Sequence, residues 1–193
     1  RFREGKGARL SFSKAQSIKN RQNIGTMSQF MKCQIKNYGK LWKELTTNDL
    51  NAYLKSIKNF QGVFAKDELP DTIEGSGVIN LDDAKGEGTH WVCWYRKRNI
   101  VYFSDSFGNR PPQEFVDRVK KQNLKLMYSD NQIQHDDSIL CGWYCVFFLS
   151  FINKGYDYHD FINQFDSSPT CENEEKIKVF ARVILKRRGS HLQ

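Results

Sequence analysis

The sequence lacks a continuous run of about 18 apolar residues, which a membrane-spanning helix would require. It begins Arg1-Phe-Arg-Glu, without an initiator methionine or an apolar signal segment, as expected of a trimmed or processed chain. Its hydrophobic content of 39% and aromatic content of 13% are typical of a globular protein, and its 193 residues suffice for one core. We therefore expect a single folded domain with no membrane contact.

Cysteines are few and irregularly spaced. They form no Cys-x-x-Cys pair of the kind that holds zinc, and no regular disulfide framework. The five are Cys33, Cys93, Cys141, Cys145 and Cys171. This pattern favours a reducing compartment and a protein that is not secreted, and it gives no reason to expect a metal site.

Acidic residues are nearly absent from the first 43 positions. This segment has eleven Lys or Arg residues against the single acid Glu4, a net charge of +10, whereas the rest has 19 basic and 21 acidic residues, a net charge of −2. Residues 1–25 are typical of an extended or mobile basic arm. Two interpretations stay open: a solvated arm, and a segment that contacts nucleic-acid phosphates without sequence preference.

Hydrophobic periodicity predicts that residues 26–193 form an α+β domain. Helices are expected over Met27–Trp42, Asn48–Ile57 with Asn48 as its cap, Gln113–Gln122, Cys141–Ile152, Tyr158–Phe165 and Glu174–Arg187. Strands are expected over Gly77–Leu81, His90–Tyr95, Ile100–Asp105 and Leu124–Tyr128. The segment from Cys141 is continuously apolar, which indicates a helix that is buried on all sides.

The two central strands are expected to bring a histidine next to a carboxylate. With the turn centred between Lys97 and Arg98, His90 faces Asp105 across an antiparallel pair, and opposed Cβ atoms lie roughly 4.5–5.5 Å apart. A carboxylate at that distance holds one imidazole nitrogen and leaves the other free to act as a base. The plainer alternative is a surface His–Asp pair on a hairpin.

Cys141 is expected to be the first residue of the buried helix. Unpaired backbone N–H groups at a helix start and a neighbouring imidazolium both stabilise a thiolate, so the position suits a nucleophile. Gly142 has no side chain and would let a substrate backbone approach. The plainer alternative is a core cysteine, and we assign that role to Cys145, one helical turn further on.

Gln134 stands seven residues before Cys141. Acyl transfer places negative charge on the former carbonyl oxygen, and a side-chain amide together with the Cys141 backbone N–H would bind it. One such donor contributes about 2.7–4 kcal/mol. A lone glutamine in a polar loop carries no signal, but the order His90, Asp105, Gln134 and Cys141 predicts a cysteine protease.

These positions lie within longer motifs. They are His90-Trp91, then Asp105-Ser106-Phe107-Gly108, then Gln134, Ser138 and Cys141-Gly142. Their order and spacing resemble the adenain-like family of cysteine proteases, found in adenoviruses, virophages and Maverick or Polinton transposons, and more distantly the SUMO proteases. The likeness spans about residues 60–155. Adenovirus enzymes have Glu where this chain has Asp105, whereas Asp serves in the SUMO branch.

The resemblance implies a papain-like or adenain-like α+β domain, with a small mixed sheet flanked by helices and the nucleophile at the start of a buried helix. It implies a triad of Cys141, His90 and Asp105, with Gln134 as oxyanion donor, that cleaves viral capsid precursors near Gly. Trp91 is expected either to line the substrate groove or to pack beneath the sheet. Trp143 is expected in the core.

The resemblance implies no metal or other cofactor. It does suggest two kinds of activator: DNA bound by the basic N-terminal segment, or a peptide joined through a disulfide to Cys33 or Cys93. We expect a monomer in the virion and the host-cell interior, in a virus factory, the cytoplasm or the nucleus. Three alternatives stay open: a protease that removes SUMO or ubiquitin-like modifiers, an acetyltransferase with the same residues, and a basic nucleic-acid-binding protein with structural Cys and His.

Overall fold

The computed structural model describes residues 2–4, 9–10 and 42–189, and the structural statements below concern these residues. The helices are α2 (Thr47–Leu54), α3 (Gln113–Lys121), α4 (Cys141–Asn153), α5 (Tyr158–Ile162) and α6 (Cys171–Gly189). The strands are β1 (Phe2–Glu4), β2 (Arg9–Leu10), β3 (Phe60–Ala65), β4 (Ser76–Asn80), β5 (Trp91–Lys97), β6 (Ile100–Ser104) and β7 (Lys125–Ser129).

The strands form one mixed sheet in the order β2-β1-β7-β6-β5-β4-β3. The pairs β3–β4 and β6–β7 are parallel, and the other pairs are antiparallel. The predicted mixed sheet within an α+β domain is confirmed. From the predicted arm 1–25, the described residues belong to β1 and β2, which add to the edge of the sheet at β7. The rest of that arm, and the predicted helix Met27–Trp42 up to its last residue, lie outside the described residues.

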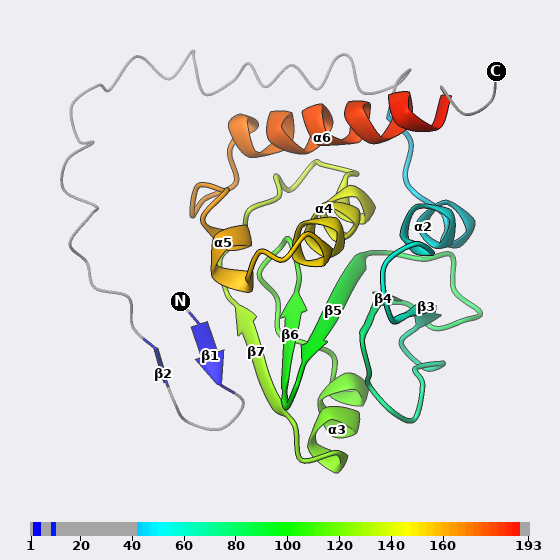
Figure 1. The fold of residues 1–193 in the computed structure, drawn as a ribbon, viewed down its shortest axis with the longest axis vertical. Helices are drawn as coiled ribbons and strands as arrows, with labels where there is room; N and C mark the ends of the chain where they lie inside the picture. Colours follow the sequence, from blue (N-terminus) through cyan, green and yellow to red (C-terminus); the bar gives the residue numbers. More distant parts are fainter. Residues whose placement is uncertain (1, 5–8, 11–41, 190–193) are drawn as a thin grey trace.

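Helices cover both faces of the sheet, and each face has its own core. On one face α4 lies between β5 and α6, with α2 and α5 beside it, and α3 packs on the other face (Figure 1). Successive residues of β5 alternate between these cores, since Cys93 packs toward α4 whereas Val92 and Trp94 pack with α3. Because β5 is buried on both faces, its end is a rigid support for the residue that precedes it, His90.

The predicted register of β5 and β6 is wrong by two residues. Trp94 pairs with Phe103 and Lys97 with Ile100, so the turn consists of residues 98 and 99, one position later than expected. Arg98 adopts the left-handed conformation that this turn requires, with φ of 58°. Since a shift of two residues leaves each side chain on the same face of the sheet, the predicted approach of His90 and Asp105 survives the error.

The start of α2 also differs from the prediction. Thr46 rather than Asn48 is the cap, because its side chain accepts the N–H of Asp49 at 3.2 Å and the Asp49 carboxylate accepts the N–H of Thr46 at 3.0 Å. This reciprocal pair is a capping box. The remaining predicted helices and strands are present with ends displaced by a few residues, and β3 was not predicted.

The cysteines differ in their surroundings. Cys93 and Cys145 are buried free thiols and Cys141 is a half-buried one, whereas Cys171 is disulfide-bonded, which the irregular spacing of the cysteines did not predict. Spacing along the chain does not determine which cysteines meet in the fold. No helix in the described part of the chain is both long and apolar enough to cross a membrane.

Candidate active site

The start of α4 brings Cys141 to a cavity of about 650 Å³. α4 is buried because its side chains are apolar nearly all round, and Cys141 is its first residue, as predicted. Behind it Trp143 and Cys145, each 3% exposed, belong to the core. No side chain caps this end of α4, so the first N–H groups of the helix are available to stabilise negative charge beside the sulfur.

His90 and Asp105 meet immediately beyond the paired strands. His90 precedes β5 and Asp105 follows β6, and His90 Nε2 lies 2.7 Å from Asp105 Oδ1. Their side chains are only 10% and 1% exposed. Because Nε2 is occupied, the second ring nitrogen, Nδ1, is left for Cys141, which lines the same cavity and raises the pKa of His90. The structure thus brings three of the predicted residues together.

A tight turn after β6 holds the Asp105 carboxylate. Asp105 Oδ1 also accepts the backbone N–H of Phe107 at 2.8 Å, and the Gly108 N–H donates to the Asp105 carbonyl at 3.0 Å. Gly108 has φ of 71°, and a side chain there would come within 2.8 Å of the Asn131 backbone, so only glycine fits. The Phe107 ring packs on His90 with centroids 4.6 Å apart. The motif therefore fixes both the carboxylate and the imidazole plane.

The surroundings of His90 keep it protonated at neutral pH. Burial lowers the pKa of His90, but the hydrogen bonds to Asp105 and Cys141 and the charges of both partners outweigh burial and raise it from 6.5 to about 9. A protonated imidazole beside the sulfur stabilises a thiolate. The site therefore holds a charged imidazole at the cavity that Cys141 also lines.

Gln134 lines the same cavity and has no exposed surface. Its Oε1 accepts the Ser106 hydroxyl at 2.5 Å, and its Nε2 donates to the Ser138 carbonyl at 2.8 Å. A side-chain amide has two N–H groups, and the second has no partner among the described residues. Gln134 therefore keeps one amide N–H that is not bonded within the described part of the chain.

The two predicted groove residues differ in position. Trp91 lines the cavity, packs against the core under α4 and donates its Nε1–H to the Leu45 carbonyl at 2.8 Å. Its contact with a substrate stays a prediction. Gly142 is buried and is not among the residues that line the cavity. A Cβ at Gly142 would lie 3.0 Å from Leu45 Cβ, so the missing side chain makes room for Leu45 and not, as predicted, for a substrate.

Two residues behind the site were not singled out as site residues from the sequence. Ser106 hydrogen-bonds Gln134 through its side chain, and its carbonyl accepts the backbone N–H groups of Ile133 and Gln134 at 2.9 and 3.0 Å. The buried Glu174 on α6 accepts the Ser138 hydroxyl at 2.7 Å. Ser106 lies within the recognised motif, but Glu174 has no sequence signal, since its partner is 36 positions away.

In the described part of the chain, neither a metal site nor an accessible partner thiol adds to this arrangement. Within residues 2–4, 9–10 and 42–189, no group of three or more His, Cys, Asp or Glu side chains is placed to hold a metal ion. Cys93 has no exposed surface, so it is not accessible for the predicted disulfide with an activating peptide. Cys33, the other cysteine considered for that disulfide, lies outside the described residues.

The sequence matches no protein-family model and no curated protein. Among solved structures it is similar to the crystal structure of the ASFV pS273R protease, with a TM-score of 0.35 and 21% sequence identity. The similarity covers 51% of this chain and 41% of that one, so the chain spans less than half the length of that protease. A likeness this distant does not assign an activity to this chain.

Proposed function

We propose that this protein is a cysteine endopeptidase with Cys141 as nucleophile, His90 as acid and base, and Asp105 as the group that orients His90. One observation carries the proposal. The first residue of a buried helix, Cys141, lines one cavity of about 650 Å³ together with a histidine that is itself held at 2.7 Å by a buried aspartate.

The reaction follows from these positions. The Cys141 thiolate attacks a peptide carbonyl carbon and forms a C–S bond, and the carbonyl electrons move onto the oxygen. When the oxyanion collapses, the C–N bond breaks and His90 gives its proton to the leaving amine. His90 then removes a proton from water, which hydrolyses the thioester and releases the carboxylate product. Asp105 stabilises the imidazolium in each step at which it forms.

Negative charge on the substrate oxygen would be stabilised by Gln134 and the start of α4. The free N–H of Gln134 Nε2 and the uncapped backbone N–H groups at Cys141 border the same cavity. Such donors act on the transition state more strongly than on the substrate, and the loss of one costs about 10²–10³-fold in kcat. Gln134 is therefore assigned as the side-chain oxyanion donor.

The proposed substrates are viral structural precursors, cleaved near Gly. The motif resemblance to adenain-like enzymes supports this, and so does the open cavity, which accepts a segment of polypeptide. The corresponding place of action is the virion and the host-cell interior, and the proposed form is a monomer. The basic N-terminal segment would hold the enzyme on packaged DNA, in which case its retention on DNA would weaken as salt rises.

A second candidate function is the removal of SUMO-like modifiers by the same chemistry. Asp105 supports it, because the adenovirus enzymes that the motifs resemble have Glu at this position. A side-by-side assay separates the two candidates: release of a Gly-Gly-ended modifier from lysine favours deconjugation, and cleavage of capsid-like peptides alone favours the maturation enzyme.

The proposal is tested by the reactivity of the thiols. We expect iodoacetamide to alkylate Cys141 at neutral pH, because the adjacent His90 imidazolium stabilises the reactive thiolate. The buried Cys93 and Cys145 serve as internal controls and should stay unmodified in the folded protein. Alkylation of Cys141 should slow markedly in His90→Ala. A Cys141 that resists the reagent in the wild type would favour the rival interpretation, a nucleic-acid-binding protein with structural Cys and His.

A further inference from the structure

Glu174, in the first turn of α6, is a buried carboxylate that no lysine or arginine of the described residues pairs with. It has no exposed surface and forms no ion pair within the described part of the chain. Burial of a carboxylate is costly unless hydrogen bonds compensate for the lost water. The hydrogen bonds to the Glu174 carboxylate therefore show which part of the fold it holds in place.

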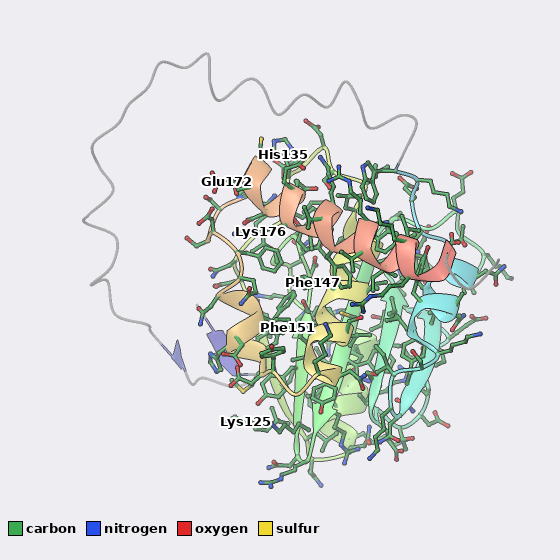
Figure 2. The ribbon with its side chains drawn as sticks, turned by 45° about the horizontal axis from the view of Figure 1, so that its top comes forward. Lys125, His135, Phe147, Phe151, Glu172 and Lys176 are labelled. Carbon is green, nitrogen blue, oxygen red and sulfur yellow. The ribbon has the colours of Figure 1, made fainter. Side chains whose placement is uncertain are left out.

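Within the described residues, all the hydrogen bonds to the Glu174 carboxylate come from the loop before α4 or from α4 itself. Oε1 accepts the His135 backbone N–H at 3.0 Å and the Tyr144 hydroxyl at 3.1 Å, and Oε2 accepts the Ser138 hydroxyl at 2.7 Å. Figure 2 shows His135 beside the start of α6, near Glu172. A single carboxylate thus ties the later part of the loop, at His135 and Ser138, and the first turn of α4 to α6.

Ser138 carries this restraint to the proposed oxyanion site. Its hydroxyl oxygen accepts the Leu140 N–H at 3.2 Å, immediately before Cys141, and its carbonyl accepts Gln134 Nε2 at 2.8 Å. The contact with Ser138 fixes the direction of the Gln134 amide and hence that of its free N–H. The path from Glu174 to Gln134 contains one intermediate residue.

The neighbouring Asn173 anchors the other end of the loop. Its Nδ2 donates to the Ile133 carbonyl at 3.1 Å, and the Ile133 and Gln134 N–H groups donate to Ser106 in the turn that follows Asp105. The loop is therefore held by α6 on one side and by the turn after Asp105 on the other. Both sets of hydrogen bonds fix its conformation.

We infer that Glu174 is a positioning residue that holds Gln134 and the start of α4 in the geometry required to stabilise the oxyanion. The inference rests on the proposed peptidase function. α6 belongs to the active-site architecture through this residue, although Glu174 itself is not among the residues that line the cavity. Its effect is on the transition state more than on substrate binding, since it acts through an oxyanion donor.

The experiment compares Glu174→Gln with the matched control Glu172→Gln, in which an exposed carboxylate two residues away is changed. The amide keeps the volume of Glu174 but turns an N–H₂ group toward a donor. We expect kcat for Cys141-dependent peptide cleavage to fall about 10–100-fold in Glu174→Gln, within the cost of a lost oxyanion donor, with KM little changed. Glu172→Gln should match the wild type.

A nuclear magnetic resonance measurement reads the position of Gln134 without reference to activity. In ¹⁵N-labelled protein, the Gln134 side-chain amide signal, assigned with Gln134→Glu, should shift in Glu174→Gln and not in Glu172→Gln. If Glu174→Gln does not fold, Ser138→Ala removes the hydroxyl that joins Ser138 to Glu174 and should produce the same two effects. Unchanged kcat, or an unchanged Gln134 signal, overturns the inference. If the wild type lacks Cys141-dependent cleavage, the proposed function fails and the signal alone decides the positioning role.

Discussion

At the scale of single residues, the site depends on a proton held by His90. The aspartate, the cysteine and the aromatic ring of Phe107 all contact this one imidazole. In the proposed mechanism, the imidazolium stabilises the thiolate and supplies the proton that the leaving amine requires. The protonation of His90 therefore affects both the free energy of unfolding and the proposed reaction.

We predict that His90 stabilises the fold in a pH-dependent way. Its pKa is raised from 6.5 to about 9, so its contribution is fully present below pH 6.5 and is lost as the pH rises through about 9. Urea unfolding of the wild type and His90→Gln should show a difference in unfolding free energy that shrinks across this window. A difference that stays constant with pH would contradict the ion-pair description.

The candidate site residues could be predicted from the sequence, but the residues that hold them in place could not. His90, Asp105, Gln134 and Cys141 are recognisable because the chemistry restricts which side chains can serve and in which order. Glu174 is invisible in the sequence, because a buried acid is recognised only by the partners that surround it in the fold, and these are 30 to 39 positions away.

At the scale of helices and strands, α4 was predictable from its continuous apolar run, whereas the central hairpin was predictable only in outline. The two-residue error in register arose from a turn in which Arg98 adopts φ of 58°. This left-handed conformation is uncommon for arginine and is not predicted from a sequence pattern. β3 was missed because its residues are only partly buried and it is paired in parallel with β4 alone. Parallel pairing gives no local turn signal.

Gly77 in β4 provides a test of how tightly the sheet packs under the site. It pairs with Trp94 of β5, and a Cβ at Gly77 would lie 2.1 Å from the Trp94 ring. Trp94 is fully buried and its Nε1–H donates to the Glu74 carbonyl at 3.0 Å, so it has little freedom to move. We predict that Gly77→Ala lowers the free energy of unfolding by about 1–3 kcal/mol.

Urea unfolding measures this effect, with the exposed residue Thr72 as the site of the control. Thr72→Ala should change the unfolding free energy by less than about 0.5 kcal/mol, as is usual for surface positions. A Gly77→Ala variant as stable as the wild type would show that the Trp94 core repacks and that the sheet is looser than described.

At the scale of the whole molecule, the charge of the cavity opposes that of the chain. The protein has a net charge of +8, yet the described residues that line the cavity include five carboxylates and no lysine or arginine. The five are Glu44, Glu68, Asp83, Glu87 and Asp136. Asp83 is paired with Lys66 at 3.4 Å, whereas Glu44, Glu68 and Glu87 form no ion pair within the described residues.

We predict that the proposed peptidase prefers basic residues beside its cleavage site, since the unpaired carboxylates attract them. Peptides of one sequence, with either Lys or Glu flanking the scissile Gly, should differ by about tenfold in kcat/KM at low ionic strength, in favour of Lys. Because salt screens exposed charges, the ratio should fall as salt is added. Equal cleavage of both peptides at low salt would contradict this account of the cavity.

The most direct test of the central claim compares the wild type with Cys141→Ser on candidate capsid precursors, with new protein termini mapped by mass spectrometry. The account predicts termini near Gly with the wild type and none with Cys141→Ser, because serine keeps the shape of the site without a thiolate. Cys145→Ala, which alters a buried cysteine one turn further along α4, should cleave as the wild type does. Termini that form equally with Cys141→Ser would contradict the assignment of Cys141 as the nucleophile.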